Sequence, residues 1–221
     1  MKKNIAVAIA IALASSIICY FGYQKYKLNE FIELASPHIK NTSLRVANEL
    51  GYELDQSTKI TFKEIFNKLE EDISEMDKRN LEVQTITNAK NKDISAPAVE
   101  YIKACQVLAR SLLDYNRKLL GRNSASDWAD SQLADYKASI GTYSSEYAKK
   151  STDKAINDLE KANSDYFETM PGIIDSAKKL KASREVASKI FQNEALVSQD
   201  RLDELINKFT PKENNKIPAK K

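Results

Sequence analysis

The chain has 221 residues, with 34 Lys and Arg against 31 Asp and Glu, a net charge of +3, and only 5 Gly and 5 Pro. This length is enough for one domain with a sizeable core, and the scarcity of glycine and proline favours long helices over sheets rich in tight turns. Lys2 and Lys3 account for most of the positive excess, so the rest of the chain has no overall basic field. This excludes nucleic acid as the implied partner.

The chain contains two cysteines, which exclude a disulfide scaffold. Cys19 lies in an apolar N-terminal segment and Cys105 lies on the apolar face of a predicted helix, so we do not expect them to pair. A lone buried thiol usually packs as a small hydrophobic group. We therefore expect Cys105 to be a core residue rather than a redox or metal-binding one.

Residues 5–24 predict a transmembrane signal anchor, preceded by a short N-terminal flank at residues 1–4. As a helix, the uncharged run from Ile5 to Tyr23 is about 28 Å long, which matches the apolar core of a bilayer. Aromatic and basic residues cluster at its far end, as they do at a membrane interface: Tyr20, Phe21, Tyr23, Lys25, Tyr26 and Lys27. The sequence therefore predicts contact with membrane lipid through residues 5–24.

Two other fates of the N-terminal segment stay open. A signal peptidase acting at Ala12-Leu13-Ala14 would leave an apolar new N-terminus, and lipoprotein processing at Cys19 would require a small residue in place of Ile18. The lysines on the two flanks are close to balanced, but the short, doubly basic N-terminus resembles a secretory leader. We expect a single-pass inner-membrane protein with a periplasmic or extracellular body.

Residues 25–210 predict an all-α domain, an elongated antiparallel bundle of about four long amphipathic helices. Ser36 and Pro37 are expected to start a short helix that ends at Gly51. Thr61 and Glu64 form a capping box for the next helix. Its apolar seam follows 4,3 spacing and consists of Phe62, Phe66, Leu69, Ile73, Met76, Asn80, Val83 and Thr87.

The later helices are bounded by glycine and proline. Ser95 and Pro97 open a helix whose apolar face is broad enough to require at least two neighbours. Gly121 is predicted to end it, and a longer helix from Ser124 is predicted to bend at Gly141. After Pro171-Gly172 comes the last helix, and residues 211–221 predict a disordered basic tail.

Motifs that carry chemistry are not evident. His38 is the only histidine and is expected at a helix start, so a His-based zinc site or a Ser/His pair is not predicted. The glycines are isolated, which argues against a phosphate-binding loop. Acidic runs at Glu70–Asp72 and Asp203–Glu204 are interpreted as solvated helix faces. We therefore predict no catalytic, cofactor-binding or metal-binding residues and no cofactor.

One group of aromatic residues gives a candidate partner or ligand surface. Its members are Trp128, Tyr136, Tyr143 and Tyr147. Core packing at helical spacing is the simpler interpretation, and a binding surface is the alternative because Tyr and Trp are enriched at interfaces.

These patterns favour a non-enzymatic, membrane-anchored helical bundle that acts through protein–protein contacts. Such a protein would be a scaffold, an adaptor or an accessory subunit of a bacterial envelope system, with an unidentified protein partner, and homo-oligomers stay open. The alternative is a ligand-binding or sensing bundle that holds a small apolar or aromatic molecule between its helices.

Overall fold

The computed structural model describes residues 2–54, 62–86 and 92–211, and the side chains of residues 15–53, 64–86 and 95–211. This part of the chain is all-α, as predicted, with no β-strand. The elements are α1 (Lys2–Leu54), α2 (Phe62–Ile86), α3 (Lys92–Ser139), α4 (Ser145–Phe167), α5 (Met170–Ala187), the 3₁₀ helix η2 (Asn193–Ala195) and α6 (Gln199–Phe209).

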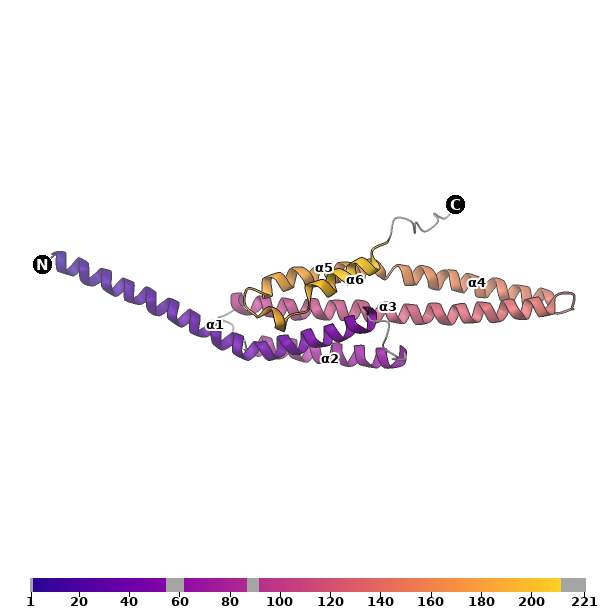
Figure 1. Ribbon diagram of the computed structural model, residues 1–221, viewed down its shortest axis with the longest axis horizontal. Helices are drawn as coiled ribbons and strands as arrows, with labels where there is room; N and C mark the ends of the chain where they lie inside the picture. Colours follow the sequence, from indigo (N-terminus) through magenta and orange to yellow (C-terminus); the bar gives the residue numbers. More distant parts are fainter. Residues whose placement is uncertain (1, 55–61, 87–91, 212–221) are drawn as a thin grey trace.

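The helices form an elongated bundle around α3 (Figure 1). α3 contacts α1, α2, α4 and α5, while α6 packs on α5 and also touches α1. Two parts project from opposite ends of the bundle: the first half of α1 at one end, and the hairpin made by the second half of α3 with α4 at the other.

The apolar seams predicted for α2 and α3 form the core. Leu69, Met76 and Val83 of α2 are buried, whereas the side chain of Phe62 lies outside the described part. The broad face of α3 is covered by several helices, as expected. Its buried members are Tyr101, Ile102, Cys105, Leu108, Ala109, Leu112, Leu113 and Tyr115.

Tyr101 ties three parts of the chain together from the centre of the core. Its side chain is fully buried, its Oη lies 2.8 Å from Ser43 Oγ of α1, and it accepts a hydrogen bond of 2.8 Å from the backbone N–H of Val197, which precedes α6. Cys105 is buried as predicted, and burial raises the pKa of its thiol to about 12. A thiol with so high a pKa is unreactive at neutral pH.

The helix start predicted at Ser36-Pro37 is wrong, because α1 continues through both residues. The Ser36 hydroxyl donates to the carbonyl of Ile32 at 2.6 Å, within the same helix. A proline inside a helix removes one hydrogen bond and kinks the helix, and α1 changes direction where it joins the bundle (Figure 1). Burial of Phe31 and Ile39 on either side of the proline stabilises the continuous helix.

The break predicted at Gly121 is also wrong, because α3 runs through it to Ser139. The chain reverses at Gly141 instead. There φ is +84°, a backbone conformation that glycine adopts without a steric penalty. Gly141 therefore marks the tip of a hairpin rather than a bend within one helix.

The predicted transmembrane anchor at residues 5–24 gains no support from the structure. The side chains of residues 1–14 lie outside the described part, as do Thr61 of the capping box and residues 212–221 of the basic tail. Among the residues that the structure does describe, no helix combines the length and the apolar character needed to cross a membrane.

Candidate interaction surface

The base of the α3–α4 hairpin is fixed to the bundle by aromatic and polar contacts. Tyr115 of α3 meets Phe209 of α6 edge to face with 4.9 Å between ring centroids, and its hydroxyl oxygen lies 3.1 Å from that of Tyr166 on α4. Arg122 donates to Asn163 at 2.7 Å, and its guanidinium lies 5.4 Å from the centroid of the Tyr166 ring. These contacts join the two arms of the hairpin to each other and the α3 arm to α6.

Beyond this base, small residues make up the contact between the two arms. Ala129 of α3 and Thr152 and Ala155 of α4 are the buried residues there. The Thr152 hydroxyl donates to the carbonyl of Gln132 at 2.9 Å, and the Ser151 hydroxyl donates to the Gln132 side chain. Small side chains allow the two helices to lie close together, which leaves little apolar surface to be buried between them.

The large apolar side chains of the hairpin are therefore exposed to solvent. Tyr143 at the tip is fully exposed and Tyr147 is 79% exposed. Beyond the base of the hairpin, the exposed large apolar residues are Trp128, Leu133, Ile140, Tyr143, Tyr147 and Ile156. We name these six residues the hairpin surface.

Three of the four aromatic residues singled out from the sequence belong to this surface. Trp128, Tyr143 and Tyr147 are exposed, whereas Tyr136 is half-buried. The four are distributed along the hairpin and do not form one compact cluster. Ile140 and Ile156 are exposed as well, because the chain reverses at Gly141 and no third helix among the described residues covers the hairpin.

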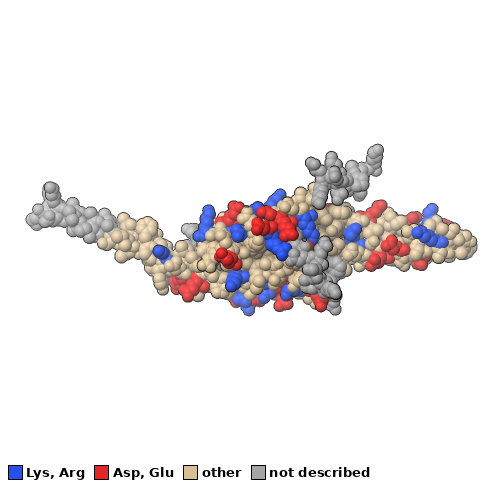
Figure 2. All heavy atoms as spheres, viewed as in Figure 1, with Lys and Arg blue, Asp and Glu red and all other residues tan. Residues whose placement is uncertain are grey.

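Charged side chains of both signs surround the hairpin surface. The α3 arm carries Asp127, Asp130 and Asp135, and the α4 arm carries a lysine pair at Lys149 and Lys150. Figure 2 shows Lys, Arg, Asp and Glu mixed over the visible face of the hairpin and of the bundle. Apolar residues within a polar rim are the usual composition of a protein-binding surface.

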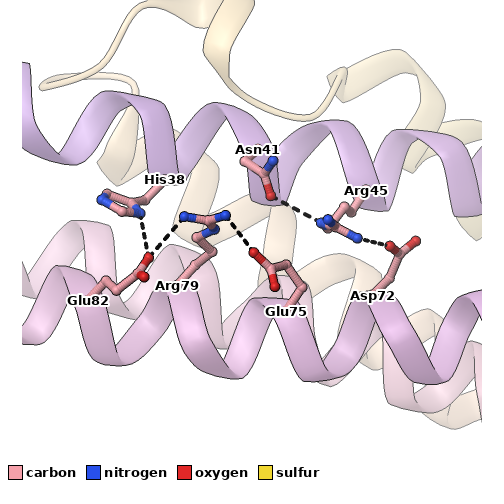
Figure 3. Close-up of polar contacts among 7 residues, drawn as sticks. All are labelled: His38, Asn41, Arg45, Asp72, Glu75, Arg79 and Glu82. Atoms are coloured by element: carbon pink, nitrogen blue, oxygen red, sulfur yellow. Dashed lines mark hydrogen bonds and ion pairs between the residues drawn. The ribbon is translucent and has the colours of Figure 1, made fainter.

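A second polar site lies between α1 and α2 (Figure 3). Nδ1 of His38 is 3.0 Å from Glu82 Oε2, and the same oxygen is 3.0 Å from a guanidinium nitrogen of Arg79. Arg79 also pairs with Glu75, one turn earlier on α2. His38 therefore lies in mid-helix with a carboxylate partner, and the prediction of a helix-start residue is wrong.

Further along the same interface, a buried carboxyl pair faces an arginine. Glu49 and Asp72 are each 2% exposed, and Arg45 forms an ion pair with Asp72. Burial, followed by a hydrogen bond with Asp72, raises the pKa of Glu49 to about 9. Glu49 therefore keeps its proton to a higher pH than an ordinary glutamate does. The prediction of a solvated face at Asp72 is wrong, because α1 covers it.

This polar interface joins two helices, α1 and α2. Within residues 2–54, 62–86 and 92–211, no group of three or more His, Cys, Asp or Glu side chains is placed to hold a metal ion. No sequence pattern indicates this site, because Glu and Asp side chains such as those of Glu49 and Asp72 are exposed in most helices.

Comparisons with models of protein families, with curated proteins and with solved structures found no match to this chain. The functional argument therefore rests on the residues and their arrangement. Of the surfaces described, the hairpin surface combines exposure, aromatic side chains and projection from the bundle.

Proposed function

We propose that this protein is a non-enzymatic, membrane-anchored helical bundle that presents the α3–α4 hairpin to a protein partner. The observation that carries this proposal is the hairpin surface, where Trp128, Tyr143 and Tyr147 are exposed on a projecting element. Exposed apolar residues rimmed by polar ones mark interaction sites. Trp and Tyr are also the residues that most often dominate the binding energy of an interface.

The proposed anchor is the apolar start of α1. Ile18 is 71% exposed, and Ile17, Tyr20 and Phe21 are exposed beside it, on a part of α1 that projects from the bundle (Figures 1 and 2). Together with the uncharged run from Ile5, these residues form the span proposed at residues 5–24. A bilayer would cover apolar side chains that the bundle leaves uncovered.

The proposed anchor and the hairpin tip lie at opposite ends of the molecule (Figure 1). α3 has 48 residues, and a helix of that length spans about 70 Å. The bundle would therefore act as a rigid spacer that holds the hairpin surface away from the membrane. This length supports a scaffold, an adaptor or an accessory subunit of an envelope system. The proposed place of its body, on the outer side of the cytoplasmic membrane, rests on the short, doubly basic N-terminus, which resembles a secretory leader.

Co-purification from native membranes tests the partner proposal. The test protein carries Ile140→Ser, Tyr143→Ser and Tyr147→Ser, and the matched control carries Leu34→Ser, Leu44→Ser and Leu81→Ser, which are exposed on α1 and α2. We expect a specific partner to be retained by the wild-type and control proteins and lost from the hairpin variant. Equal retention by all three would overturn the assignment of the hairpin surface.

A second candidate function is the binding of an apolar ligand by the bundle. It is favoured by an open groove of about 800 Å³ between the first half of α3 and the second half of α5. This volume is in the usual range for small-molecule sites. The groove is remote from the hairpin, so the two functions are independent.

A further inference from the structure

The groove between α3 and α5 has an apolar floor made of small side chains. Alanine, proline and valine residues from both helices line it: Ala96, Pro97, Ala104, Val107, Ala182 and Val186. Val107 and Val186 are 43% and 47% exposed, so they remain open to solvent. The groove therefore has an apolar lining from both helices and a volume of about 800 Å³, which is in the usual range for a small-molecule site.

The groove is also lined by three charged side chains and one hydroxyl group. Glu100 and Lys103 form an ion pair of 3.2 Å on α3. Lys179 on α5 has no carboxylate partner within the described part of the chain. The hydroxyl oxygen of Ser183 is buried and has no hydrogen-bond partner among the described residues. An unpaired cation beside an apolar groove favours a ligand with an anionic end and an apolar chain.

The groove also lies at the end of the bundle that faces the proposed anchor. It is lined by the first turns of α3 and the last turns of α5, and both lie at the end from which α1 projects (Figure 1). The groove is therefore closer to the proposed anchor than the hairpin is.

We propose that the α3–α5 groove binds the chain of a single-chain anionic lipid, a long-chain fatty acid, with its carboxylate at Lys179. The apolar floor accepts the acyl chain, and removal of its CH₂ groups from water favours binding. Lys179 holds the carboxylate at the rim, where both partners stay partly hydrated. This inference rests on the second candidate function and does not depend on the hairpin surface.

Photo-crosslinking in lipid vesicles tests the proposal on the full chain. The protein is reconstituted in phosphatidylcholine vesicles that contain a long-chain fatty acid with a diazirine on its chain, and labelled peptides are identified by mass spectrometry. We expect label in peptides that contain residues 96–107 and 179–186. The fatty alcohol with the same chain and diazirine is expected to label them about three-fold less, because it lacks the charge that pairs with Lys179.

Two variants with matched controls make the test specific. Ala182→Trp fills the groove from an exposed position and should abolish the label, while Ala47→Trp, at an exposed position of α1, should keep it. Lys179→Gln should lower the label about three-fold, while Lys178→Gln, next to it but outside the groove, should not. Circular dichroism of each variant establishes that the bundle is folded.

Two results would overturn the proposal, and they have different consequences. Label confined to the N-terminal part of α1, with both the acid and the alcohol, would overturn the lipid site and the second candidate function together. Equal label with acid and alcohol in the groove, unchanged in Lys179→Gln, would overturn the anionic ligand alone and leave a site for neutral apolar chains.

Discussion

At the scale of single residues, the most unusual group is the buried Glu49 carboxyl. It lies in the α1–α2 interface beside Asp72, with Glu53 on the next turn of α1 and Lys68 on α2 also affecting its charge. The Glu53 carboxylate is itself held by Asn116 of α3 and Lys208 of α6. A buried charge without compensation is costly, so the proton on Glu49 stabilises the packed interface.

The proton on Glu49 predicts that the protein loses stability as the pH rises. The pKa of Glu49 is about 9 in the folded protein and has its ordinary value of 4.5 when unfolded, so the folded state binds more protons between these values. The free energy of unfolding should therefore fall with rising pH, by at most about 1.4 kcal/mol per pH unit, until about pH 9. Chemical denaturation at several pH values measures this slope.

The variant Glu49→Gln isolates this effect. Its amide keeps a hydrogen-bond donor for Asp72 and cannot titrate, so its stability should depend less on pH than that of the wild type. Glu71→Gln, which changes an exposed carboxylate next to Asp72, is the control and should keep the wild-type slope. Identical slopes for both variants would contradict the protonated state of Glu49.

Tyr101 provides a second prediction at the residue scale. Tyr101→Phe removes the hydroxyl that accepts from Val197 N–H and contacts Ser43 Oγ, and it leaves a buried backbone donor without a partner. We expect a loss of about 1–3 kcal/mol in the free energy of unfolding. Tyr147→Phe, at an exposed hydroxyl, should change it by less than about 0.5 kcal/mol. A thermal or urea unfolding curve compares the two.

At the scale of the helices, substitutions of two glycines test where α3 ends. Gly121 lies inside α3, and a methyl group added there would meet no atom within 4 Å. A methyl group at Gly141 would also have open space, but Gly141 has a φ of +84°, which L-residues with a side chain rarely adopt. Gly121→Ala should therefore raise the free energy of unfolding by about 0.5–1 kcal/mol, and Gly141→Ala should lower it by about 1–2 kcal/mol. Stabilisation by both substitutions would contradict the hairpin turn at Gly141.

The sequence predicts which residues form the buried face of a helix, but it predicts poorly where the helices begin and end. Spacing alone identifies Leu69, Met76 and Val83 as the buried face of α2, because a 3.6-residue period is a direct consequence of helix geometry. The choice between Gly121 and Gly141 as the break depends on which partner helix covers α3. Local sequence does not contain that information. It likewise does not show that α1 continues through Pro37.

The sequence identifies the aromatic residues of the hairpin surface, but it does not show that they are exposed. Trp128, Tyr143 and Tyr147 are notable as aromatics in a polar segment, but their periodicity fits core packing as well as exposure. Their exposure follows from the hairpin, whose two arms meet through Ala129 and Ala155. The buried Glu49–Asp72 pair could not be inferred, because pairing between α1 and α2 brings together residues far apart in the chain.

At the scale of the whole molecule, the anchor and the bundle are expected to be separable. The first buried core residue among the described side chains is Phe31, so removal of residues 1–26 should leave the core intact. Because the truncated chain lacks the proposed span, it should stay folded by circular dichroism but fail to float with vesicles in a density gradient, whereas the full chain floats. Flotation of the truncated chain would place the membrane contact elsewhere.

The central claim is that the hairpin tip contacts a partner at a distance from the membrane. The most direct measurement is photo-crosslinking in living cells with a photoreactive amino acid at Tyr143, and at Glu71 on α2 as an exposed control. The proposal predicts a discrete crosslinked protein from position 143 and none from position 71. No crosslinked product at position 143, or the same products from both positions, would contradict the hairpin as the partner surface.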